Sequence, residues 1–293
     1  MTQTHTLQTP GAVLTYDVRP GTSATEPPLL LAGSPMGAAG FGTLAGHFPD
    51  RTVVTYDPRG VERSRRTDGA TETTPEEHAD DLSRLIATLD AGPADVFASS
   101  GGAVNALVLV ARRADQVRTL VAHEPPALQL LPDREPALAA TRAVRAAYLD
   151  HGFGAGMAGF IRLVGHRGPV PADLGPAPDP AAFGLPAGDD GSRDDALLGH
   201  NLLTCTAHEH DLPALRTAST RVVVAVGAGS AGELAHRCGL ALAERLGTPP
   251  VVFPGDHAGF LGGEYGMTGE PDAFAARLRE VLAADRDRAV AGG

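Results

Sequence analysis

Residues 93–113 read PADVFASSGGAVNALVLVARR, and this stretch decides the fold. Its first part is a short run of small and apolar residues, which is typical of a buried strand. Its last part is almost wholly apolar and long enough for a buried helix. Gly101 and Gly102 stand between the two parts, where they allow the backbone to turn sharply. We therefore expect a strand over 93–100 that runs directly into a helix over 101–113.

The same alternation of strand and helix extends on both sides of this stretch. Apolar runs that end at glycine or proline predict further strands within 12–19, 27–37, 51–60, 117–126, 221–227 and 248–260. Helices are expected over about 40–48, 74–90, 231–246 and 271–284. Thr74 and Glu77 have the spacing of a capping box at the start of the second of these helices. Strand–helix alternation is typical of a mostly parallel sheet.

The alternation stops between residues 127 and 217. This segment contains helical stretches near 135–149, 155–164 and 194–206, separated by segments rich in Pro, Gly and Asp. No strand is predicted there. We therefore expect an α/β core domain made of residues 1–126 and 218–293, interrupted by a helical insertion over 127–217.

Composition excludes several classes of function. The net charge of −11 and the isoelectric point near 5.4 argue against a surface for nucleic acid or anionic membranes. All 24 basic residues are Arg, so a catalytic or phosphate-binding lysine is excluded. Two cysteines and a polar N-terminus predict a reducing, cytoplasmic location. No apolar run approaches the roughly 18 residues that a membrane helix needs.

Ser100 stands at the junction of the predicted strand and helix, within Ala98-Ser99-Ser100-Gly101-Gly102. This segment resembles the nucleophile elbow of the α/β-hydrolase fold family, whose motif is G-x-S-x-G. Ala98 departs from the motif but is still small, as the tight turn requires. The resemblance implies that Ser100 is a nucleophile and that the N–H of Gly101 binds a developing oxyanion. The alternative is a flexible turn without chemistry.

Two further segments resemble parts of the same family. Gly33-Ser34-Pro35 follows an apolar strand, where the family has a turn that supplies the second oxyanion donor. Ala32 replaces the usual His, and Ser34 would donate because Pro35 has no N–H. His257 lies in a glycine-rich loop after the last predicted strand, which is the place of the family's general base.

The acid of the triad is not where the family most often has it, in the loop after strand 221–227. That loop offers no acid, and Ser230 and Glu233 are spaced as a capping box, which accounts for Glu233. Glu124 follows the strand that begins at residue 117, a place that some family members use. We expect Glu124 to reach the ring of His257 and hold its tautomer. The alternative is an ordinary exposed glutamate.

Gly227, Gly229 and Gly232 are also spaced as in a dinucleotide-binding turn, with Asp256 further along the chain. Only about 60 residues follow, too few for the second half of a Rossmann sheet. We therefore interpret this turn as a hydrolase loop and expect no cofactor. His208-Glu209-His210-Asp211 does not match a zinc-binding spacing, so no metal is expected.

Taken together, these motifs identify the chain as a member of the α/β-hydrolase fold family. The resemblance implies a mostly parallel, eight-stranded sheet flanked by helices, with a helical cap inserted after strand six. It implies a serine hydrolase that cleaves small or medium hydrophobic esters, lactones or thioesters through a Ser100–His257–Glu124 triad and an acyl-enzyme. We expect a small-molecule substrate, no nucleic-acid or membrane partner, and a monomer or homodimer. Apolar cap residues available to line the pocket are Phe153, Met157, Phe160, Phe183, Leu202, Leu203 and Cys205.

Two other functions stay open from the sequence. The same triad could perform carbon–carbon bond hydrolysis, perhydrolysis or a biosynthetic cyclisation. The chain could also be a ligand-binding protein that has lost catalysis, because Ala32, Ala98 and Gly229 depart from the family pattern.

Overall fold

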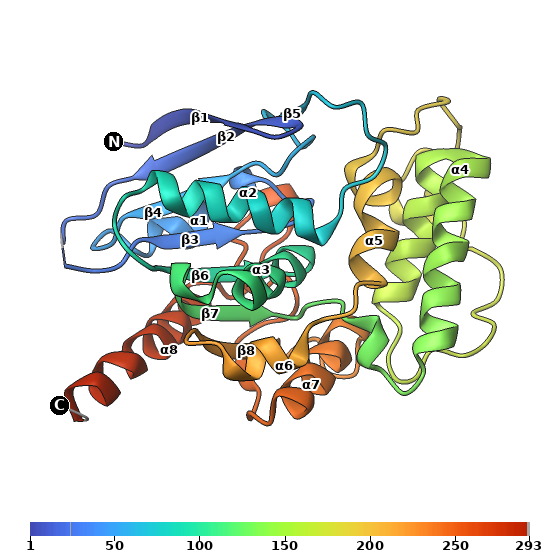
Figure 1. Ribbon diagram of the computed structural model, residues 1–293. Coiled ribbons are helices and arrows are strands. Elements are labelled where there is room, and N and C mark those ends of the chain that lie inside the picture. The colour runs from blue at the N-terminus through green and yellow to red at the C-terminus, as the bar shows by residue number, and fades with distance from the viewer. Residues whose placement is uncertain (24, 292–293) are drawn as a thin grey trace.

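One sheet runs through the molecule and carries helices on both faces (Figure 1). The computed structural model describes residues 1–23 and 25–291, with side chains described as far as residue 284. The strand order is β1 (Gln3–Thr9), β2 (Ala12–Arg19), β4 (Val53–Tyr56), β3 (Leu29–Ala32), β6 (Ala94–Ser99), β7 (Val117–His123), β8 (Arg221–Gly227) and β9 (Val251–Phe253). The two-residue strand β5 (Arg65–Arg66) pairs with β2.

The direction of the strands divides the sheet into two parts. The six strands from β4 to β9 along this order are parallel to one another. β1 and β2 form an antiparallel pair at one edge, and β2 is antiparallel to β4. The predicted fold class, a mostly parallel α/β sheet flanked by helices, is therefore confirmed.

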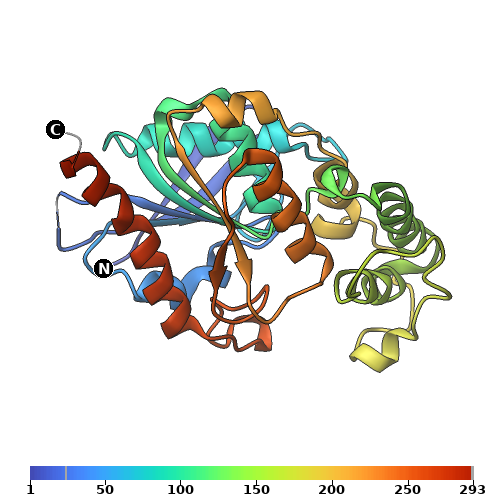
Figure 2. The ribbon, with the colours of Figure 1, turned by 90° about the horizontal axis from the view of Figure 1, so that it is seen from below.

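Helices cover both faces of the sheet because the central strands are apolar on both sides. In β3, Leu29 and Leu31 pack toward one face, and Leu30 and Ala32 pack toward the other. The first face is covered by α1 (Gly42–Gly46) and α8 (Pro271–Ala291), and the second by α2 (Pro75–Thr88), α3 (Gly101–Arg112) and α7 (Leu234–Leu246) (Figure 2). The predicted capping box at Thr74 is present at the start of α2. None of the helices in the described range is long and apolar enough to cross a membrane.

The segment between β7 and β8 is helical. It contains the short helical turns η3 (Leu128–Leu130), η4 (Pro180–Phe183) and η5 (Ala196–Asn201), and the helices α4 (Arg134–Val164), α5 (Leu202–Thr206) and α6 (Leu212–Thr217). Figure 1 shows α4 and α5 beyond the end of the sheet toward which the parallel strands point. Their apolar side chains form a cluster separate from the two clusters of the sheet.

α6 falls inside the predicted insertion but packs with the sheet domain. Its Leu215 is buried in the same cluster as Leu107 of α3 and Val224 of β8. Figure 1 shows α6 beside α7, apart from α4 and α5. The helices that stand away from the sheet therefore end before α6 begins.

α4 turns back on itself at Gly152. This residue has φ 86° and ψ −175°, a combination that other residues avoid. The two arms of the turn meet closely, because a Cβ on Gly156 would lie 2.6 Å from Cβ of Tyr148. Glycines thus let the predicted helical stretches at 135–149 and 155–164 pack side by side.

A buried carboxylate fixes the start of strand β6, which leads to the turn at Ser100. Asp95 is fully buried and accepts hydrogen bonds from Arg51 Nη2 at 2.5 Å and from Arg118 Nε at 2.8 Å. Arg51 is itself buried and also donates to the carbonyl of Pro27, just before β3. The cluster joins the entries to β3, β6 and β7, at the opposite end of β6 from Ser100.

Asp95→Asn should therefore lower the free energy of unfolding by about 3 kcal/mol, because it leaves the buried Arg51 charge without its carboxylate. Chemical denaturation followed by circular dichroism measures this loss. Asp80→Asn is the matched control, since among the described residues Asp80 forms only an exposed 3.8 Å ion pair with Arg112. It should change the free energy of unfolding by no more than about 0.5 kcal/mol. Equal effects of the two substitutions would contradict the role given to Asp95.

Candidate active site

The turn from β6 into α3 places Ser100 in a left-handed backbone conformation, with φ 56° and ψ −128°. Such a conformation is uncommon for a residue other than glycine and is tolerated where neighbouring contacts enforce it. The N–H of Ser100 donates to the carbonyl of His123 in β7 at 3.0 Å. A Cβ on Gly102 would lie 2.5 Å from the carbonyl oxygen of Ala32, so only glycine allows α3 to approach β3 this closely. The sharp turn leaves the Ser100 side chain partly exposed.

The backbones of Gly101 and Ser34 lie against each other beside Ser100. A Cβ on Gly101 would lie 2.6 Å from the carbonyl oxygen of Ser34. Within the described part of the chain, no protein group accepts a hydrogen bond from the N–H of Gly101 or of Ser34. Gly101 is also the first residue of α3, where the helix dipole favours negative charge. These two amides are available for an anionic oxygen.

Glu124 follows the last residue of β7 and is fully buried. Its Oε2 lies 2.6 Å from Nδ1 of His257. Its Oε1 accepts hydrogen bonds from the N–H of Gly227, at 2.9 Å, and from the hydroxyl of Ser230. The structure thus brings together two of the predicted triad residues and surrounds the carboxylate with donors.

The donors around Glu124 keep it ionised. Burial by itself raises the pKa of this carboxyl group, because the interior solvates charge poorly. Hydrogen bonds from His257 and Ser230 and the nearby imidazoles outweigh burial and lower the pKa to about 2. A permanent carboxylate on Nδ1 fixes the ring orientation of His257 and leaves Nε2 as its second nitrogen for proton transfer.

The role of Ser230 differs from the sequence prediction. The spacing of Ser230 and Glu233 predicted a capping box, but α7 begins at Leu234 and no side chain caps its first turn. Ser230 is buried and donates to Glu124 instead, while Glu233 pairs with Arg167 at 3.2 Å near the surface. The capping-box interpretation is therefore wrong, and the sequence contained no separate signal for the contact between Ser230 and Glu124.

His123 contacts both Ser100 and His257. His123 accepts the Ser100 N–H, and its ring stacks on the His257 ring with a centroid distance of 5.9 Å. Among the described residues, no hydrogen bond joins the Ser100 hydroxyl to His257. Hydrogen bonds of this kind are often long before substrate is bound and shorten in the complex.

The helical segment between β7 and β8 contributes one side chain at the elbow. Sγ of Cys205, in α5, lies 3.3 Å from the position of a Cβ on Gly101. Burial raises the pKa of this thiol to about 12, so it is neutral at physiological pH. Phe183, which the sequence offered as a pocket residue, lies in η4 and is largely exposed. Leu202 is buried within the cluster of the helical segment itself.

Comparison with known proteins identifies the family. The sequence profile of the alpha/beta hydrolase fold matches residues 29–162. An uncharacterized hydrolase of Bacillus subtilis, YraK, is 32% identical and covers 94% of this chain and 95% of its own length. The chain belongs to the α/β-hydrolase fold family.

Solved structures share the fold of this α/β hydrolase over nearly its whole length. A thermophilic esterase from Thermogutta terrifontis superposes with a TM-score of 0.66 at 19% identity, covering 96% of this chain and 98% of its own. An enol-lactonase from Burkholderia xenovorans superposes with a TM-score of 0.60 at 18% identity, covering 95% and 100%. At these identities the similarity is one of fold.

Three amides at the glycine-rich end of β8 donate hydrogen bonds to groups of the protein. The N–H groups of Gly227, Ala228 and Gly229 donate to Glu124 Oε1, the Phe253 carbonyl and the Gly255 carbonyl. A dinucleotide-binding turn needs such amides for the pyrophosphate of its cofactor. Here groups of the protein accept these hydrogen bonds, and the acceptor of the Gly227 amide is the Glu124 carboxylate.

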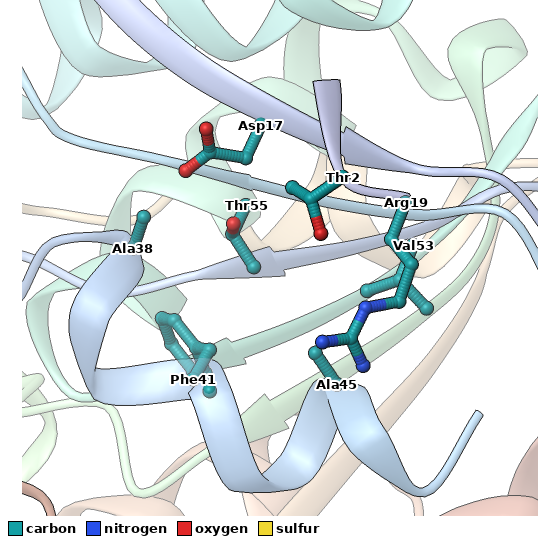
Figure 3. A pocket seen from close by; sticks show the side chains of 9 residues that line it. Thr2, Asp17, Arg19, Ala38, Phe41, Ala45, Val53 and Thr55 are labelled. Atoms are coloured by element: carbon teal, nitrogen blue, oxygen red, sulfur yellow. The ribbon is translucent and has the colours of Figure 1, made fainter. Parts of the chain in front are cut away.

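A small cavity of about 160 Å³ lies elsewhere, between β2, β4 and the η1–α1 segment, where η1 spans Ala38–Phe41 (Figure 3). Asp17, Arg19 and Phe41 are among its lining residues. The Asp17 carboxylate is already bonded to Arg63 and to Thr4. The lining includes none of the candidate site residues, so this cavity is separate from the site around Ser100.

Glu124 should make the free energy of unfolding depend on pH in the acid range. Its pKa in the folded protein, about 2, is below its ordinary value of 4.5, so its stabilisation is complete above pH 4.5 and is lost as pH falls toward 2. The difference in unfolding free energy between the wild type and Glu124→Gln should therefore shrink by about 2 kcal/mol between about pH 6 and about pH 3. Denaturant titrations of both proteins at each pH measure this. A pH-independent difference would show that the carboxylate is not held as described.

Proposed function

We propose that this α/β hydrolase is a serine hydrolase that cleaves small or medium hydrophobic esters, lactones or thioesters, with Ser100, His257 and Glu124 as its triad. The observation that carries the proposal is the buried Glu124 carboxylate, 2.6 Å from Nδ1 of His257. A buried charge is costly unless it is paired, and this one is directed at an imidazole beside a strained serine elbow. The fold neighbours described as an esterase and an enol-lactonase support the class of substrate.

In the proposed mechanism, each of these groups has a defined role. His257 Nε2 takes the proton of the Ser100 hydroxyl while Ser100 Oγ attacks the carbonyl carbon of the substrate. The N–H groups of Gly101 and Ser34 bind the negative oxygen that forms. His257 then gives the proton to the leaving group, which departs and leaves an acyl group on Ser100. A water molecule, deprotonated by His257, attacks this ester. The bond from the acyl group to Ser100 Oγ then breaks, His257 returns the proton to Oγ, and the acid leaves.

Glu124 and the helical segment have supporting roles in this proposal. Glu124 stays ionised and stabilises the imidazolium form of His257 in both steps. The helical segment between β7 and α6 acts as a cap, with α4 and α5 beyond the end of the sheet. Cys205 places a small neutral thiol against the oxyanion site, which suits an uncharged acyl group better than an ionic one. The predicted substrates are accordingly hydrophobic.

A fluorophosphonate probe should label Ser100, because an activated serine attacks its phosphorus centre. Mass spectrometry of the labelled peptide identifies the site. Labelling should be lost in Ser100→Ala and in His257→Ala. The control Ser219→Ala, at an exposed position, should be labelled like the wild type. We expect Ser100→Ala to lower kcat by about 10⁶-fold. Folded protein that reacts neither with this probe nor with a smaller sulfonyl fluoride would contradict the proposal.

The proposed substrate class predicts that a panel of esters with acyl chains of increasing length gives the highest kcat/KM at short or medium length. Lactones and thioesters of the same acyl size extend the panel, and product analysis shows whether the acid is released. Ser100→Ala provides the background rate for each substrate. If no ester, lactone or thioester is turned over, the site performs another reaction or binds ligand without reaction.

A further inference from the structure

His123 is a polar residue in a strongly apolar place. It is fully buried at the end of β7, and its ring contacts the rings of Phe97, Phe253, Phe260 and Phe274 at centroid distances between 5.4 and 6.3 Å. Its Nε2 has no hydrogen-bond partner among the described residues. Burial lowers the pKa of His123 to about 4, so the ring is neutral at physiological pH. A phenylalanine would fill this space without leaving a buried nitrogen unpaired.

The ring of His123 makes two contacts that a phenylalanine could not both reproduce. Nδ1 lies 3.1 Å from the hydroxyl of Ser99, the residue immediately before the nucleophile. The ring face stacks on His257, with an interplanar angle of 25°. His123 thus connects the elbow on β6 with the base in the loop after β9. Its carbonyl contact with Ser100 is different, because any residue at this position would provide it.

The neutral state of His123 suits its place beside Glu124 and His257. A protonated ring here would compete with His257 for the Glu124 carboxylate and repel the imidazolium that forms during catalysis. A neutral ring avoids both effects and still offers Nδ1 to Ser99. The hydrogen bond between His123 and Ser99 then limits the movement of the elbow relative to His257.

We propose that His123 is a positioning residue for the reaction, and that it holds the Ser100 elbow in register with His257 through its hydrogen bond to Ser99. The inference rests on the proposed serine hydrolase function. His123→Phe should therefore stabilise the fold and slow the reaction. Phenylalanine removes a buried, unpaired nitrogen, but it cannot form the hydrogen bond to Ser99.

The test compares His123→Phe, Ser99→Ala and the double variant. We measure kcat and KM on an ester substrate, count active sites with the fluorophosphonate probe, and determine thermal stability. His123→Phe should lower kcat per labelled site by about three- to tenfold, the range of one hydrogen bond, and leave KM within about twofold of the wild type. Its thermal midpoint should equal or exceed that of the wild type. Ser99→Ala should show a similar loss.

The double variant decides whether the two residues act together. If the hydrogen bond is the cause, His123→Phe combined with Ser99→Ala should be no slower than either single variant. Losses that multiply would overturn the inference, as would a wild-type kcat in His123→Phe. If the activity falls only in proportion to the number of labelled sites, His123 has a structural role, and the inference is also overturned. Ser100→Ala is measured in parallel, and a kcat of that variant close to the wild-type value would refute the proposed function itself.

Discussion

The buried negative charge of Glu124 is the constraint on which the site depends. A carboxylate buried away from water must be surrounded by donors, and this one receives three of them from two segments more than 100 residues further along the chain. Gly227 is the last residue of β8, Ser230 follows this strand, and His257 follows β9. The ends of β7, β8 and β9 are therefore held together by one anion. The parallel sheet makes this possible, because it brings the carboxyl ends of neighbouring strands to one edge.

Two strained residues at adjacent strand ends belong to the same arrangement. Ser100 and Glu124 both have positive φ values, 56° and 47°. Each is fixed by the next strand, because the Ser100 N–H donates to His123 and the Glu124 N–H donates to Ala225, both at 3.0 Å. Sheet hydrogen bonds thus maintain conformations that an isolated loop would leave. At the other end of β6, the ion cluster of Asp95 fixes the strand that carries the elbow.

The sheet was predictable because local patterns determine most of it. Buried parallel strands such as β6 and β8 are short apolar runs, and α2 has its capping box in the sequence. β1 was not predicted, because this edge strand is polar and exposed along most of its length and acquires its conformation from pairing with β2. α6 was placed in the insertion because its chain position does not show that Leu215 packs on the sheet helices.

The sequence by itself determined the α/β hydrolase family and selected Ser100, Gly101, Ser34, Glu124 and His257 as candidates, because turns, glycines and strand ends are local features. Only the tertiary structure decided which donors hold Glu124. Ser230 lies 106 residues from its partner and has the local appearance of a helix cap. The local sequence shows His123 only as the last residue of a strand. The residues that it contacts, Ser99 and His257, belong to two other segments. Such contacts depend on the distance in space between segments, which no local pattern encodes.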